Sequence, residues 1–123
     1  MTAMLKTLSS LKNDLYGDYN GFIRLMGRYE AHLRTLNALQ LTGESGNPEV
    51  HKMNVTVAKE VIRLRCGSAL NISDRYKEEL KLLNSQRLDG LDKLQFEDAL
   101  HAFKVVLRAY DEEILRLEEI TVG

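Results

Sequence analysis

The chain has 123 residues, of which 44% are hydrophobic and 28% are charged, with a formal net charge of −1. This length fits one domain with one core, and the chain is too apolar to be disordered. One proline and eight glycines are too few for a β protein of many strands. We therefore expect a single all-α domain over residues 1–123, without the strongly basic balance that is typical of nucleic-acid-binding domains.

Residues 3–40 are predicted to form one long helix. Apolar side chains recur at steps of three and four residues from Met4 to Leu39. The phase of this pattern continues through the stretch between Gly17 and Gly21, where a break between two helices would reset it. The alternative is two shorter helices that join at this stretch.

Two polar residues of this first segment, Asp18 and His32, occupy inward-facing positions of the apolar pattern. One interpretation is that they form a polar point of recognition in an interface, because a buried polar residue fixes the register of packed helices. The other is that the helix drifts around its axis, so that Tyr19 and Leu33 take the inner positions.

A second stripe of the same segment combines small and basic residues. Its small residues allow close approach of another backbone, and its arginines lie one turn apart, a spacing suited to binding carboxylates or phosphates. The alternative is that the glycines accommodate a neighbouring helix of the same bundle, with the arginines paired to the acidic second half of the chain. We predict a partner-binding site that consists of four residues of this stripe and the adjacent tyrosine: Gly17, Gly21, Arg24, Arg28 and Tyr29.

Residues 41–48 form the clearest predicted loop, since they contain the residues that favour turns. A helix over about 49–70 follows, with Pro48 at its start. A further helical pattern covers 74–88, and whether 49–88 is one bent helix or two is left open. The predicted inner face of the helix over 49–70 consists of Val50, Met53, Val57, Val61, Leu64 and Ile62.

The last predicted helix covers about 93–120 and carries the most regular pattern of the chain. Its apolar residues alternate steps of four and three without a miss, which is the spacing of a coiled-coil seam. We predict that this seam forms an interface between helices. Its principal residues are Phe96, Phe103, Leu107, Tyr110, Ile114 and Leu117.

These elements predict an antiparallel three- or four-helix bundle with long, coiled-coil-like helices. Two apolar seams of this length exceed what the core of one small chain needs to bury. We therefore expect that part of a seam is buried between two chains and that the protein is a homodimer.

The sequence contains no pattern from which we predict catalytic, cofactor-binding or metal-binding residues. Cys66 has no histidine beside it, and its position is typical of a packed thiol rather than a nucleophile. The spacing of Asp98 and His101 suits a helical metal ligand pair, but no second matching unit exists. We therefore predict that the protein is not an enzyme, although residues from distant helices could still form a composite active site.

By exclusion, we predict a protein–protein interaction module: a small helical chaperone, adaptor or inhibitor that binds another protein. No apolar segment has the length of a signal peptide core or of a membrane span, so we expect a cytoplasmic protein that does not contact the membrane. The alternative is a nucleic-acid-associated protein. It would use a basic face of residues 24–65, formed by Arg24, Arg28, Arg34, Lys59, Arg63 and Arg65.

Overall fold

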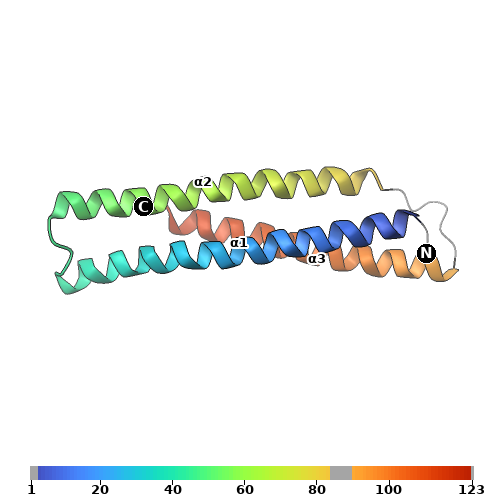
Figure 1. Ribbon diagram of the computed structural model, residues 1–123, viewed down its shortest axis with the longest axis horizontal. Coiled ribbons are helices and arrows are strands. Elements are labelled where there is room, and N and C mark those ends of the chain that lie inside the picture. The colour runs from blue at the N-terminus through green and yellow to red at the C-terminus, as the bar shows by residue number, and fades with distance from the viewer. Residues whose placement is uncertain (1–2, 84–89, 123) are drawn as a thin grey trace.

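The computed structural model describes residues 3–83 and 90–122. These residues form three α-helices, α1 (Ala3–Thr42), α2 (Pro48–Lys81) and α3 (Gly90–Ile120), and each helix packs against the other two (Figure 1). No strand occurs in this part of the chain. The prediction of an all-helical bundle is therefore confirmed.

The first segment is one continuous helix, as its unbroken apolar phase indicates. α1 runs for 40 residues through Gly17 and Gly21 without interruption. Further along, Leu33 is buried and His32 is exposed, so the helix drifts around its axis as the second interpretation expects. Tyr19 packs against the core beside Asp18, which stays half-buried.

α2 begins at a cap that its sequence encodes. The side chain of Asn47 accepts hydrogen bonds from the backbone N–H groups of Glu49 and Val50, and Pro48 occupies the first turn. The helix then continues to Lys81 without a break, so the question left open by the sequence is answered in favour of one helix as far as that residue. The last part of the predicted helix over 74–88 lies outside the described residues.

The predicted inner face of α2 is wrong except at Ile62, which is fully buried. Val50, Met53, Val57 and Leu64 are all more than half exposed. The inward residues from Ala58 to Tyr76 follow steps of three and four instead, and four of them are small, which lets α2 approach its neighbours closely. The predicted stripe of larger apolar residues ends at Leu64. The residues of α2 that are buried are His51, Ala58, Ile62, Cys66, Ala69, Ser73 and Tyr76.

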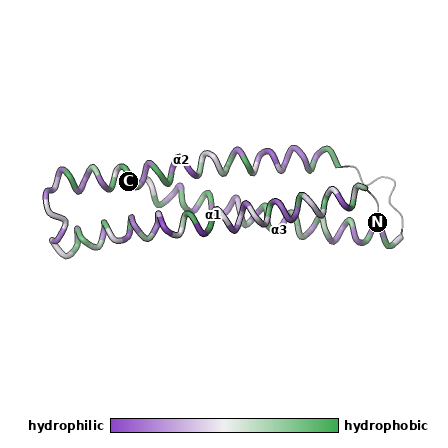
Figure 2. Tube along the Cα trace, in the orientation of Figure 1, coloured by the Kyte–Doolittle hydropathy of each residue, from purple (hydrophilic) through white to green (hydrophobic). Residues whose placement is uncertain are grey.

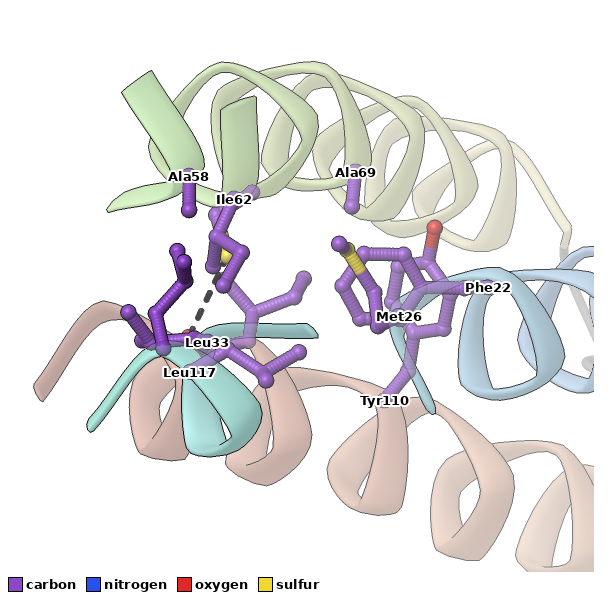
Figure 3. Packing of buried hydrophobic residues seen from close by; sticks show 11 residues of the cluster. Phe22, Met26, Leu33, Ala58, Ile62, Ala69, Tyr110 and Leu117 are labelled. Atoms are coloured by element: carbon purple, nitrogen blue, oxygen red, sulfur yellow. Dashed lines mark hydrogen bonds between the residues drawn. The ribbon is translucent and has the colours of Figure 1, made fainter. Parts of the chain in front are cut away.

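The core consists of two clusters along the bundle. One is centred on Phe22, Ile62 and Tyr110, and the other on Leu8 and Phe103 (Figure 3 shows the first). Hydrophobic residues recur along all three helices (Figure 2), which allows the core to extend along the bundle. Phe22 and Tyr110 stack with tilted rings whose centroids are 5.3 Å apart, an arrangement that aromatic pairs favour.

A polar layer lies among these apolar residues. The hydroxyl of Tyr76 donates a hydrogen bond to the carboxylate of Asp18. The fully buried Ser73 donates to Asp111 of α3 at 2.5 Å, and the second carboxylate oxygen of Asp111 lies 2.9 Å from the ammonium of Lys77. These contacts join all three helices and satisfy polar groups that would otherwise be costly to bury.

α3 ends before the hairpin of α1 and α2 does. In Figure 1 this hairpin extends beyond the carboxyl end of α3. The guanidinium of Arg63 on α2 donates a hydrogen bond to the carbonyl of Thr121 at 3.0 Å, so a basic side chain caps the end of α3. None of the three helices is both long enough and apolar enough to cross a membrane.

Candidate functional site

The small-residue stripe of α1 lies on an open surface. Gly17, Gly21, Arg24 and Arg28 are exposed, and a Cβ atom added to either glycine would meet no other group within 4 Å. The alternative that these glycines accommodate a helix of the same bundle is therefore contradicted. Tyr29 is half-buried, because it packs against the core cluster around Tyr110.

An apolar stripe of α2 lies exposed beside the α1 stripe. Its residues repeat at steps of three and four, so they share one face of the helix over about 21 Å. Exposed fractions reach 65% at Met53 and 64% at Leu64. The stripe consists of four exposed residues and one half-buried residue, Val61; the exposed residues are Val50, Met53, Val57 and Leu64.

Two adjoining hollows connect the stripes. One lies between α1 and α2, has a volume of about 260 Å³, and is lined by Gly17, Gly21 and Arg65 among others. The other is lined by Val61, Leu64, Arg65 and Ser68. Because Arg65 and Ser68 line both hollows, the stripes belong to one surface. We call this surface the α1–α2 face and define it as Gly17, Gly21, Arg24, Arg28, Val50, Met53, Val57, Val61, Leu64 and Arg65.

The arginines of the α1–α2 face carry unneutralised charge. Among the described residues, no ion pair involves Arg24, Arg28 or Arg65. In contrast, Arg116 on α3 forms a two-pronged ion pair with Glu30, with N–O distances of 2.8 and 3.1 Å. The expectation that the two stripe arginines pair with the acidic second half of the chain is therefore wrong.

The seam of α3 is buried within the single chain. All of its predicted residues are at most 6% exposed, and they pack against α1 and α2 in the two core clusters. A second chain could reach them only if the bundle opened. The described part of the chain therefore uses this seam for its own core.

The basic residues of the predicted nucleic-acid face do not form one surface. Arg24, Arg28 and Arg65 belong to the α1–α2 face. Arg63, however, is bound to Glu60 at 2.7 Å and to the end of α3. Arg34 lies near Glu30, which faces Arg116 of α3. Basic residues that lie on separate surfaces attract a nucleic-acid backbone less strongly than a continuous basic patch does.

The Cys66 thiol is fully buried and donates a hydrogen bond to the carbonyl of Ile114 at 3.8 Å (dashed in Figure 3). Burial, with a smaller contribution from nearby glutamates, raises the pKa of the thiol to about 11. A thiol in this environment is a poor nucleophile. In the described ranges, no three His, Cys, Asp or Glu side chains gather in a way that could hold a metal ion.

Neither the stripe of α2 nor Arg65 was predicted as part of a protein-binding surface, and Arg65 was predicted only for the alternative nucleic-acid face. The five apolar residues of the stripe were recognised but assigned to the core. The available signal was the second, longer pattern of small residues on the same helix. A helix with two apolar stripes can bury only one of them against two neighbours.

No protein-family model, no curated protein and no solved structure matches the chain.

Proposed function

We propose that the protein is a non-enzymatic interaction module, a small helical chaperone, adaptor or inhibitor, that binds another protein through the α1–α2 face. One observation carries this proposal: four exposed apolar residues of α2 and the half-buried Val61 form a row beside glycines that leave room for another backbone. Exposed apolar rows of this kind are characteristic of surfaces that bind other proteins. The shallow, elongated shape of the face suits an amphipathic helix.

The charge of the α1–α2 face indicates which side chains such a partner helix carries. Arg65 borders the apolar stripe, and Arg24 and Arg28 lie on the exposed stripe of α1. None of the three has an ion-pair partner among the described residues. A partner helix with an apolar stripe and flanking carboxylates would pair with these arginines while it buries Met53 and Val57. We therefore propose an acidic amphipathic helix as the bound segment.

Homodimerisation through the same face is the second candidate. The residues of the α2 stripe are spaced by three, four, four and three positions, so their spacing is the same in both directions from Val57. Two antiparallel copies of α2 could therefore bury identical sets of residues against each other, as a two-fold axis requires. A second copy would also add three more arginines to the interface, so charge favours a different protein as the partner.

The proposal is tested by affinity capture from an extract of the native host, with quantification by mass spectrometry. The wild-type chain is compared with the double variant Met53→Glu/Val57→Glu and with the control Val105→Glu/Leu115→Glu. The control changes two apolar residues of α3 that are exposed to a similar degree. We expect a protein that is captured by the wild type and the control and lost with the α2 variant. Loss with the control alone, or equal capture by all three, would contradict the proposal.

A further inference from the structure

A third hollow, larger than the two of the α1–α2 face, lies where α1 and α2 extend past the end of α3. It has a volume of about 790 Å³, within the range of small-molecule sites. We call it the end groove. It shares no residue with the α1–α2 face. Its lining consists of Asn37, Gln40, Ser45, Pro48, His51, Lys52, Val55, Thr56, Lys59, Arg63 and Thr121.

The end groove carries polar side chains, beside the apolar Pro48 and Val55, where the bundle interior would continue. Further along the bundle, α1 and α2 face α3 with residues such as Leu33 and Ile62, which are buried. In the groove, Asn37, Gln40 and His51 line the surface instead. Amide and imidazole groups are poor packing partners for an apolar helix, because their hydrogen-bonding groups would lose water without replacement. The chemistry of the groove therefore suits a polar ligand.

His51 is positioned to donate to such a ligand. It is only 6% exposed, yet no described residue forms a hydrogen bond with its imidazole. Every fully enclosed side-chain nitrogen or oxygen among the described residues has a hydrogen-bond partner. The imidazole nitrogens must therefore retain access to the groove that His51 lines.

The charge of the groove indicates the sign of the ligand. Lys52, Lys59 and Arg63 line it, and none of the described residues that line it is an aspartate or a glutamate. Glu60 and the carbonyl of Thr121 hold the guanidinium of Arg63 in place. The groove also runs along the first turns of α2, where the helix dipole favours negative charge. From Lys52 to Arg63 the helix rises by about 17 Å, which is longer than one phosphate or carboxylate can span.

From this arrangement we propose that the end groove binds a small polyanion, a molecule that carries two or more phosphate or carboxylate groups. Lys52 and Arg63 contact the anionic groups, and His51 donates a hydrogen bond from the floor of the groove. Asn37 and Gln40 of α1 supply neutral donors from the opposite wall.

The test is an NMR titration of the full chain at low salt with tripolyphosphate, with citrate, and with inorganic phosphate as a single anionic group. We expect saturable shifts of the His51 and Lys52 signals with at least one polyanion and about tenfold weaker binding of inorganic phosphate. Response to tripolyphosphate alone would identify a phosphate ligand, and response to citrate alone a carboxylate ligand. Saturation weaker than about 1 mM with both polyanions would overturn the proposal.

Variants locate the binding. Lys52→Glu reverses one exposed charge of the groove, and Lys6→Glu makes the same change at the opposite end of the bundle. We expect about tenfold weaker binding with the first variant and unchanged binding with the second. His51→Gln, with folding checked by circular dichroism, should also weaken binding. Equal loss with Lys6→Glu and Lys52→Glu would show unspecific attraction and overturn the site. Failure here leaves the protein-binding proposal intact, because the two surfaces are separate.

Discussion

The hydroxyl of Tyr76 on α2 donates a hydrogen bond to the carboxylate of Asp18 on α1. The pKa of Tyr76 is raised well above its ordinary value, mainly by burial and secondly by this hydrogen bond. The contact explains why Asp18 can occupy a half-buried position in an apolar pattern. It also ties α1 to α2 within the polar layer.

Removal of this hydroxyl should destabilise the bundle. Tyr76→Phe leaves the half-buried carboxylate of Asp18 without its donor, which we expect to lower the free energy of unfolding by about 1 to 3 kcal/mol. Urea denaturation followed by circular dichroism measures the change. Tyr16→Phe is the matched control, because the side chain of Tyr16 on α1 is exposed to solvent. Equal stability of the two variants would show that the hydrogen bond contributes nothing.

The glycines of α1 should separate stability from binding. Gly17→Ala and Gly21→Ala should each raise the free energy of unfolding by about 0.5 to 1 kcal/mol, because alanine favours the helix and its Cβ meets no neighbour. The same two changes should weaken capture of the partner, since a methyl group would hold its backbone away.

Gly27→Ala is the control for this pair. Gly27 also lies within α1 with open space around it, but outside the α1–α2 face. The variant Gly27→Ala should raise the free energy of unfolding by a similar amount and leave capture of the partner unchanged. If all three variants bind alike, no partner backbone approaches Gly17 or Gly21.

Cys66 should be protected from thiol reagents in the folded chain. Its thiol is buried, and its pKa of about 11 keeps it protonated at pH 8. We expect labelling by a chromogenic disulfide to be slow in buffer and rapid in concentrated urea. Rapid labelling without denaturant would mean that α2 separates readily from α3 at this position.

The ion pair of Glu30 and Arg116 should contribute to stability only above acid pH. The hydrogen bond from Arg116, opposed by burial, lowers the pKa of Glu30 below 4.5. A lowered folded-state pKa gives stability that is present above the unfolded-state pKa and lost as the pH falls. Glu30→Gln should therefore differ from the wild type most at pH 7, by at most about 1 kcal/mol because the pair is partly exposed, and less towards pH 3. A difference that grows in acid would contradict this account.

The sequence predicts the parts of the fold that depend on one helix at a time. The apolar phase through Gly17 and Gly21 predicts the continuity of α1, and the regular spacing of α3 predicts which residues share one face. The inner face of α2 could not be predicted in the same way. Its choice depends on how closely α1 and α3 approach, which favours Ala58 and Ala69 over Val57.

The two candidate surfaces also differ in how far the sequence of a single helix predicts them. Gly17, Gly21, Arg24 and Arg28 form a recognisable stripe because they lie on one helix. The end groove depends on where three helices end relative to one another, and the contact of Arg63 with Thr121 joins residues far apart in the chain. No local pattern carries that information.

The most direct test of the central claim is site-specific photo-crosslinking in the native host. A benzophenone amino acid replaces Val57 on the α1–α2 face in one version of the chain and Val105 on α3 in another. We expect a discrete adduct with a different protein from position 57 and none from position 105, and loss of the adduct when Arg24→Glu and Arg28→Glu are added. An adduct of two copies of this chain would support the homodimer instead. Adducts from position 105 alone, or none from position 57, would contradict the claim.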